Sequence, residues 1–313
     1  MPTLPQTNII AVANGYDALD TPFTESGLED YTDGMYFGDP TIPYEIAQSN
    51  QLNYLLDEIK CGPGSRILDI GCGAGTLLEE ARKRGAQGIG LTLSPAQAQR
   101  CQAKGLDVRV MNYRDIPQNW NGKFDGIIAN GSVEHFVNAQ DALKGGQDLI
   151  YQELFEISHR LLDPHSSARR FTTTIIHFRG TSINPKALIR NPFLLPWGSS
   201  EFHCALLMQN FAFYPSRGQL EKNAKPLFVP TSTIDGTEDY RLTSEEWLRR
   251  LRKAFLSSPK MWKSIAHSFT KSPSVTVKGF ISIFITESWN WQFRSKNGNP
   301  PPMQLFRHTW QAQ

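Results

Sequence analysis

A short apolar segment that runs directly into three closely spaced glycines constrains the fold of this chain more than any other feature. Residues 66–71, RILDIG, have the character of a buried strand, and residues 76–85 that of a helix. Between them, Gly71-Cys72-Gly73-Ala74-Gly75 forces a tight turn, and its glycines let the backbone approach a ligand closely. The segment therefore predicts the first strand and helix of an α/β sheet, with a binding loop between them.

The same alternation of strands and helices continues along the chain. Further strands are predicted at residues 88–94, 107–113, within 124–136, at 169–178 and near the end at 303–313. Helices are predicted at residues 44–59, from Ser94-Pro95 onward, at 149–164, at 244–265 and within 280–293. This order predicts an α/β fold with a doubly wound, mostly parallel sheet covered on both faces. Residues 180–230, which are rich in proline and aromatic residues, break the alternation and predict an inserted helical cap.

Composition narrows the class of protein. The chain has 313 residues, 40% of them hydrophobic, with a net charge of +2, which is typical of a soluble globular enzyme and argues against a nucleic-acid partner. Its four cysteines have no metal-ligand spacing, so no metal site is expected. The longest apolar run, Phe280–Ile285, is far below the roughly 18–20 residues that span a bilayer. With no evident signal peptide, a cytoplasmic location is expected. No sequence feature indicates an oligomeric state.

The glycine loop itself indicates which cofactor it binds. A dinucleotide fingerprint has the spacing G-x-G-x-x-G, whereas the spacing here is G-x-G-x-G, and Asp69 precedes it. A carboxylate beside the loop repels a pyrophosphate but suits a ligand that carries an ammonium group and a sulfonium. This favours S-adenosylmethionine (SAM). The alternative, a tight turn that binds nothing, does not account for Asp69 and the strands that follow.

Four segments then resemble one family. LDIGCGAG, GLTLSPAQ, NYRDI and FDGIIANGSVEHF occur in the order and at the intervals of the cyclopropane-fatty-acyl-phospholipid synthases. That family includes mycolic acid methyltransferases and plant alkaloid N-methyltransferases, and the resemblance is strongest over residues 31–140. It implies a Rossmann-like class I methyltransferase fold with a seven-stranded sheet. It also implies an N-terminal lid segment at residues 1–42 and a methyltransferase domain at 43–313, which contains the cap at about 180–230.

The resemblance also implies which residues bind SAM. Thr92 and Gln97 correspond to the family's ribose contacts, and Tyr113 with Arg114 to the pair that frames adenine. The segment YTDGMYF resembles the family's lid motif, so that Tyr31 and Tyr36 are candidates for covering the cofactor. The full set of expected cofactor-binding residues is Tyr31, Tyr36, Asp69, Gly71, Gly73, Gly75, Thr92, Gln97, Tyr113, Arg114 and Asn130.

Candidate catalytic residues follow the fourth predicted strand, where ligands bind in doubly wound sheets. Glu134 and His135 are placed at the active site by the resemblance: the glutamate helps to hold a bicarbonate base in cyclopropane synthases, and the pair deprotonates the amine in N-methyltransferases. The ordinary alternative is that His135 caps the next helix and that Glu134 is solvated. DYRLTSEEW resembles a further family segment, which brings Tyr240 to the reacting centre, just before a helix that begins near Trp247. Ordinary packing is the alternative for Tyr240.

Two departures from the family bear on the reaction. Gly34 occupies the position of a lid cysteine, and Thr173 that of a strand histidine, both of which complete the bicarbonate site of cyclopropane synthases. His177 lies four residues further along the strand, about 13 Å away at about 3.3 Å per residue. The sequence therefore favours transfer of an intact methyl group over cyclopropane formation.

Three functions remain open. The first is a SAM-dependent methyltransferase that acts on carbon or nitrogen of an apolar small molecule or lipid, since the aromatic cap suits an apolar pocket. Its aromatic residues alternatively form the cap's own core. The second is a cyclopropane synthase with an altered base site, and the third is a non-catalytic SAM-binding module. The helix at residues 245–263 carries apolar residues such as Trp247 and Leu251 opposite basic ones, which is typical of a peripheral membrane helix and also of an ordinary amphipathic helix.

Overall fold

A seven-stranded sheet organises the chain. The computed structural model describes residues 12–13, 15–16, 20, 22–180, 182–209 and 212–313. The strand order is β3-β2-β1-β4-β5-β7-β6, in which β1 to β5 pair in parallel and β7 runs antiparallel to both of its neighbours. The strands are β1 (Arg66–Ile70), β2 (Gln87–Thr92), β3 (Asp107–Val110), β4 (Gly126–Asn130), β5 (Arg170–Phe178), β6 (Phe228–Asp235) and β7 (Met303–Ala312). The predicted doubly wound sheet, mostly parallel and seven-stranded, is confirmed.

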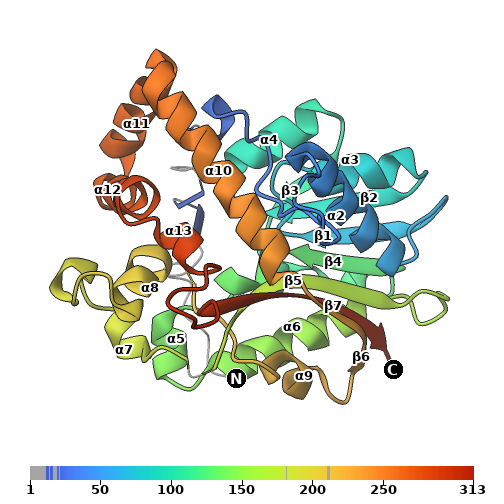
Figure 1. Cartoon of the computed structure of the whole chain (residues 1–313). Helices are drawn as coiled ribbons and strands as arrows, with labels where there is room; N and C mark the ends of the chain where they lie inside the picture. Colours follow the sequence, from blue (N-terminus) through green and yellow to red (C-terminus); the bar gives the residue numbers. More distant parts are fainter. Residues whose placement is uncertain (1–11, 14, 17–19, 21, 181, 210–211) are drawn as a thin grey trace.

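Helices cover both faces of this sheet (Figure 1). On one face lie α2 (Tyr44–Glu58), α3 (Thr76–Lys83) and α4 (Pro95–Ala103), whose apolar residues share a core with alternate strand residues such as Ile67 and Ile128. On the other face, α6 (Gln147–Leu161) packs against the intervening residues, such as Leu68 and Ile127. Because successive strand side chains point to opposite faces, one buried strand serves two cores.

Short elements connect these layers. They are the 3₁₀ helices η1 (Tyr113–Asp115), η2 (Gln118–Trp120) and η3 (Val133–His135) and the helix α5 (Ala139–Leu143). The capping of α4 is as predicted, since Ser94 accepts a hydrogen bond from the Gln97 N–H and Pro95 occupies the first helical position.

The predicted cap region holds α7 (Pro185–Leu188), η4 (Pro192–Leu194), α8 (Ser200–Met208) and α9 (Gln219–Ala224). After β6 come α10 (Thr237–Ser257), α11 (Pro259–Lys271), α12 (Pro273–Phe280), the π-helix η5 (Ile281–Ile285) and α13 (Ser288–Trp291). The aromatic residues of the cap fall in both of the predicted environments, because Phe202 and Phe213 are buried whereas Phe193 and Trp197 are exposed.

The helix predicted at residues 244–265 was wrong in its bounds. It is two helices, because Pro259 has no N–H to continue the first one, and Ser258 is extended between them. The first of the two begins at Thr237, so Tyr240 lies in its first turn rather than before it, and Trp247 lies in its middle.

The apolar side of α10 belongs to the core. Trp247, Leu248 and Leu251 are at most 6% exposed and pack with Phe23 and Leu28. The interpretation of this side of the helix as a membrane-binding face is therefore wrong, and the ordinary amphipathic helix is what the fold contains. None of the helices in the described part of the chain combines the length and apolar character that crossing a bilayer needs.

Candidate active site

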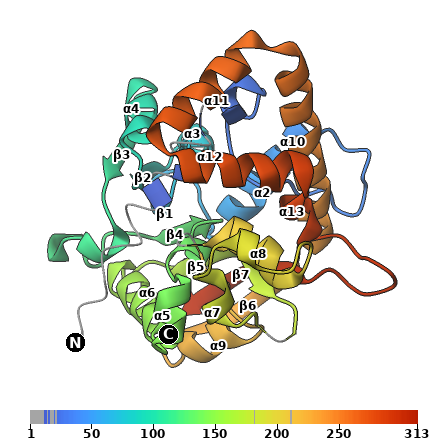
Figure 2. The ribbon, with the colours of Figure 1, turned by 90° about the vertical axis from the view of Figure 1, so that its left-hand side faces the viewer.

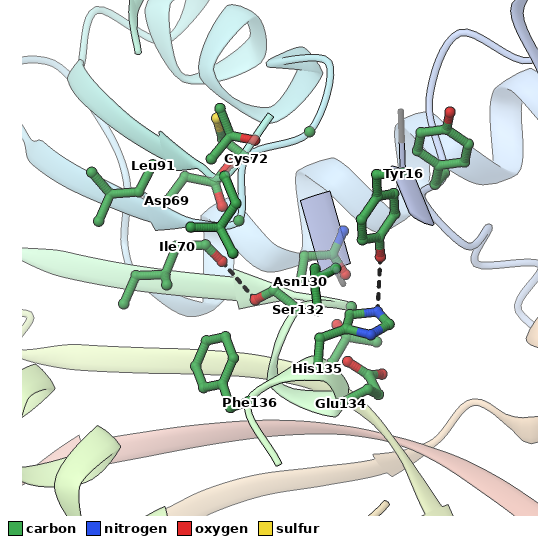
Figure 3. Close-up of a pocket in the computed structure, with 18 of the residues that line it drawn as sticks. Tyr16, Asp69, Ile70, Cys72, Leu91, Asn130, Ser132, Glu134, His135 and Phe136 are labelled. Atoms are coloured by element: carbon green, nitrogen blue, oxygen red, sulfur yellow. Dashed lines mark hydrogen bonds between the residues drawn. The ribbon is translucent and has the colours of Figure 1, made fainter. Parts of the chain in front are cut away.

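One cavity of about 830 Å³ lies at the carboxyl ends of the parallel strands, beneath α10 and α13. It gathers twelve of the fourteen residues that the sequence analysis singled out, and Figure 3 shows several of them around its wall. These are Tyr31, Asp69, Gly71, Gly73, Thr92, Gln97, Tyr113, Arg114, Asn130, Glu134, His135 and Tyr240. Two expected residues, Tyr36 and Gly75, do not line it.

The glycine loop follows β1 in a conformation that favours glycine. Gly71, Gly73 and Gly75 have φ values of +88°, +50° and +78°. A Cβ atom at Gly71 would lie 2.4 Å from the Ser132 Cβ, whereas one at Gly73 would meet no atom within 4 Å. Gly75 begins α3, and a Cβ there would lie 2.7 Å from Leu106 and 2.9 Å from Cys101. Gly73 therefore faces open space in the cavity, whereas Gly75 serves the packing behind the loop.

Asp69 is the next-to-last residue of β1 and lines the cavity. It is 2% exposed, and its Oδ1 has no hydrogen-bond partner among the described residues. Burial raises the pKa of Asp69 to about 8, with nearby Asp30 adding to the effect. A buried carboxyl group without a cationic partner is costly in the ligand-free protein, and it suits a ligand that brings a positive charge.

Two polar side chains at and after the end of β2 also line the cavity. Thr92 and Gln97 are both buried, and the Thr92 hydroxyl donates to the Gln97 Oε1 over 2.8 Å. Because Ser94 caps α4, the Gln97 side chain on the first turn of that helix points back toward the strand end. The two side chains thus form one polar patch beside the glycine loop.

Two stacked aromatic side chains also line the cavity. The Tyr113 ring stacks on Phe136, with 4.3 Å between ring centroids and 14° between planes. Arg114 is held by Glu153, with 2.7 Å between Nε and Oε2. Tyr113 and Arg114 line the cavity as expected, and Phe136 joins them although the sequence analysis did not single it out. The sequence signal that could have identified Phe136 was its position directly after Glu134 and His135.

Glu134 and His135 lie in η3, directly after β4. The Glu134 Oε1 accepts a hydrogen bond from the Ile176 N–H at 2.9 Å, and its buried Oε2 has no partner among the described residues. Burial raises the pKa of Glu134 to about 8. The alternative of a solvated Glu134 is therefore wrong. His135 does not cap the next helix either, since Asn138 occupies that position with a capping box.

Two tyrosines complete this end of the cavity. The Tyr16 hydroxyl lies 2.8 Å from the His135 Nε2 (Figure 3), and the sequence analysis did not single it out. Tyr240 comes from the first turn of α10, and its ring packs on Phe293 at 4.4 Å between centroids. Burial raises the pKa of Tyr240, so its hydroxyl keeps its proton at neutral pH.

Thr173 does not lie at the site, where the sequence analysis had placed it. Thr173 and His177 point to the face of β5 opposite the cavity, where the Thr173 hydroxyl accepts a hydrogen bond from the Trp310 Nε1. The residues of β5 that line the cavity are Thr174 and Ile176. Neither is a histidine, so that the strand supplies no imidazole to this site. Gly34 in the lid supplies no side chain either.

A buried ionic network holds the lid segment over the sheet. Arg307 of β7 is fully buried and donates to Asp33 at 2.6 Å, to the Gly34 carbonyl at 3.0 Å and to Asp239 of α10 at 2.7 Å. It also donates to Gln51 of α2. Burial raises the pKa of Asp33 to about 6, although Arg307 opposes this shift. The sequence analysis missed this network. The available signal was a lone arginine within MQLFRHTW, a strand that has no other lysine or arginine and no acidic residue.

Tyr36 lies elsewhere. It is 3% exposed and lines a smaller hollow between the lid and α10, together with Pro40, Tyr44 and Glu246. The backbone N–H of Tyr36 donates to Asp239, which fixes the end of the lid. The two tyrosines of the YTDGMYF segment are therefore separated, with Tyr31 in the cavity and Tyr36 outside it.

Comparisons with known proteins identify related sequences and similar folds. The chain is 28% identical over 232 residues to the cyclopropane-fatty-acyl-phospholipid synthase of Escherichia coli K12, which is 72% of this chain and 50% of that protein. Two solved structures match over almost the full length of both chains. They are the cyclopropane synthase MmaA2 of Mycobacterium tuberculosis, with a TM-score of 0.71 and 17% identity over 100% of both chains, and the mycolic acid cyclopropane synthase CmaA1, with 0.70 and 18% over 99% of both. These two likenesses show the fold.

The family assignment comes from the sequence. The chain spans no more than half the length of the curated relatives that it matches. The family model of mycolic acid cyclopropane synthetase matches residues 6–189, which is more than half of the chain. The protein therefore belongs to the mycolic acid cyclopropane synthetase family.

Proposed function

We propose that the protein is a SAM-dependent methyltransferase that transfers an intact methyl group to carbon or nitrogen of an apolar small molecule or lipid. One observation carries the proposal: the glycine loop with Asp69 and the cluster of Glu134, His135 and Tyr240 open into the same cavity. A cofactor held at the loop and an acceptor held at the cluster therefore share one enclosed space.

The residues of the loop suit SAM. The unpartnered Oδ1 of Asp69 would receive the cationic end of the cofactor, and the open space at Gly73 leaves room beside the backbone. Thr92 and Gln97 would hold the ribose, and Tyr113 with Phe136 would border the adenine. When bound, SAM supplies an electrophilic methyl group. A relative of the same fold, CmaA1, is complexed with SAH and CTAB in its crystal structure.

At the other end of the cavity, this chain's own residues position the acceptor and handle its proton. Glu134 is fixed by the Ile176 N–H and keeps one oxygen available to accept a hydrogen bond or a proton. Tyr16 orients the His135 ring. Tyr240, Trp247 and Trp289 supply apolar walls that exclude water from the reacting atoms. The apolar character of these walls supports an apolar acceptor.

Cyclopropane formation is the second candidate, because MmaA2 and CmaA1 are named cyclopropane synthases. That reaction needs a base that removes a proton from the transferred carbon. Glu134 and Tyr240 line the cavity, but Gly34 supplies no side chain to it and β5 supplies no histidine. Transfer of an intact methyl group needs neither, and we therefore favour it.

A labelling experiment separates the two reactions. The purified protein is incubated with SAM that carries a trideuterated methyl group and with a total lipid and metabolite extract, and products are identified by mass spectrometry. A product that retains three deuterium atoms supports methyl transfer. Retention of two means that the transferred carbon lost a proton, which supports cyclopropane or methylene chemistry. SAM binding without any product in the wild-type protein would favour a non-catalytic SAM-binding module.

A further inference from the structure

One stretch of the chain has an unusual distribution of charge. Residues 247–286 contain eight lysines and arginines and no aspartate or glutamate. The three arginines of this stretch are paired with Glu246, Glu45 and Glu287, which lie outside it. Four lysines are exposed and form no ion pair with any residue that the structure describes: Lys253, Lys260, Lys263 and Lys271. The end of α10 and α11 therefore present uncompensated positive charge.

Apolar side chains are exposed on the same helices. Among the described residues, ten of the sixteen exposed large hydrophobic side chains come from residues 185–199 or 256–285. On α11, Trp262 is 54% exposed and Phe269 is 49% exposed, and the two lie seven residues apart on one side of the helix. Lys263 lies about 100–120° around the helix from these two side chains, whereas Lys260 lies on the far edge of the exposed surface of α11. Exposed apolar area of this extent marks an interaction site.

An incompletely covered aromatic cluster joins α10, α11 and α12. The Phe255 ring lies 4.3 Å from Trp262 and 4.8 Å from Phe284 between ring centroids, and Phe280 lies 5.0 Å from Phe284. None of the four side chains is fully buried, and α12 has no buried residue at all. The cluster gives these helices a fixed arrangement while it leaves their outer surface apolar.

This surface continues onto the cap. The helix α12 contacts α8, and Figure 2 shows α8, α11 and α12 on one face of the molecule. Leu194 and Trp197, just before α8, are 80% and 66% exposed. Of these helices, α8 also lines the cavity, through Leu207, and the neighbouring α10 and α13 line it through Trp247 and Trp289. An apolar ligand that approached this outer surface would therefore lie next to helices that enclose the cavity.

We propose that α11, α12 and residues 189–199 form a docking surface for an anionic lipid bilayer. Exposed tryptophan, phenylalanine and leucine side chains enter the interfacial region of a bilayer, and unpaired lysines bind acidic headgroups. A second copy of this chain fits the surface less well, because a symmetric interface would bring the lysines of both copies together. The proposal does not rest on methyl transfer, since docking needs neither cofactor nor turnover.

Vesicle co-sedimentation tests the proposal. The full chain is mixed with vesicles of phosphatidylcholine, or of phosphatidylcholine and phosphatidylglycerol at 7:3, in low salt and in 0.5 M NaCl. Binding to the anionic vesicles is expected, together with a loss of binding in high salt. The double variants Trp262→Ser/Phe269→Ser and Lys260→Glu/Lys263→Glu should each weaken binding at least about tenfold. A blue shift of tryptophan fluorescence on vesicle binding, absent in the first variant, would report insertion of Trp262.

A matched control comes from α5 and α6, on another part of the surface. Leu149 is 55% exposed and Lys144 is exposed, so Leu149→Ser/Lys144→Glu changes the same kinds of side chain and should bind vesicles like the wild type. Unchanged melting temperature and SAM affinity in all three variants would establish that they fold. The proposal is wrong if the wild type does not bind anionic vesicles, or if the control weakens binding as much as the test variants. It is equally wrong if the test variants instead abolish a dimer in analytical ultracentrifugation without affecting vesicle binding.

Discussion

The two ends of the cavity are assembled in different ways. At the cofactor end, Asp69, Gly71 and Gly73 lie within five residues at the end of one strand, and backbone conformation does most of the positioning. At the acceptor end, Tyr16, Glu134 and Tyr240 come from segments more than a hundred residues apart. The first end depends on one local turn, and the second depends on how the lid, η3 and α10 pack together.

Both ends nevertheless contain the same chemical feature. Asp69 and Glu134 are each buried with one carboxyl oxygen unpartnered among the described residues, and burial raises the pKa of each to about 8. In the ligand-free protein at pH 7, both carboxyl groups are therefore mostly protonated. We infer that Asp69 ionises when the cationic cofactor arrives, and the variants below separate its role from that of Glu134.

The largest effect is expected for Glu134→Gln. The amide keeps the shape of the side chain and an oxygen that accepts from the Ile176 N–H, but it cannot take a proton. We expect kcat to fall about 10²–10⁴-fold, the range of general acid–base catalysis. The dissociation constant of SAM should stay within about twofold in isothermal titration calorimetry, since Glu134 lies at the other end of the cavity. Equal losses of turnover and SAM affinity would contradict the separation of the two ends.

Arg307→Met should produce the largest loss of stability. The substitution leaves Asp33 and Asp239 without their shared buried cation, and removing one partner of a buried ion pair costs about 3–5 kcal/mol. Chemical denaturation measures this loss. The double variant Arg307→Met/Asp33→Asn should recover part of it, because it removes one uncompensated carboxyl group. A single variant as stable as the wild type would show that the network does not hold the lid.

Asp69→Asn should weaken SAM binding about 30–100-fold, which corresponds to a charge-assisted contact of about 2–3 kcal/mol. Its effect on the ligand-free protein has the opposite sign. Because the pKa of Asp69 is raised in the folded state, its ionisation opposes folding as the pH rises from about 4 toward 8. The asparagine variant should therefore unfold at a higher temperature than the wild type at pH 8, and the difference should shrink at pH 5. Weaker SAM binding without this pH-dependent gain would contradict the burial of an ionisable Asp69.

The next prediction concerns the pH dependence of kcat/KM, which should change about tenfold per pH unit. If Glu134 accepts a proton, kcat/KM should rise about tenfold per pH unit below its pKa and level off above about pH 8. This rise of kcat/KM with pH should be absent from the residual activity of Glu134→Gln. If the variant shows the same rise with the same midpoint, then a group other than Glu134 causes the pH dependence.

The contrast between the two ends also explains what the sequence could predict. The glycine loop, Asp69 and the Ser94-Pro95 helix start act within a few residues, so local rules located them, although Gly75 of the loop does not line the cavity. Tyr16 and Arg307 could not be found in this way, because their partners His135, Asp33 and Asp239 are distant in the sequence. Placing Thr173 at the site was wrong for a related reason. In a strand, a shift of one residue moves a side chain to the opposite face, and no local signal in the β-branched segment TTTII fixes which face is the cavity side.

The smallest and most discriminating prediction concerns the two tyrosines of the lid. They are five residues apart and were expected to act alike, but Tyr31 lines the cavity and packs its ring on Phe23, whereas Tyr36 lines the separate hollow against α10. We expect Tyr31→Phe to raise the dissociation constant of SAM about threefold, through loss of a hydroxyl group near the cofactor. Tyr36→Phe is the matched control and should leave the dissociation constant of SAM unchanged within about 1.5-fold, the size expected for a residue that contacts no ligand.

If both variants lose affinity equally, then the lid closes over the cofactor in a way that also brings Tyr36 into the cavity. Loss of affinity in Tyr36→Phe alone would reverse the assignment of the two residues, because Tyr36 rather than Tyr31 would then contact the cofactor.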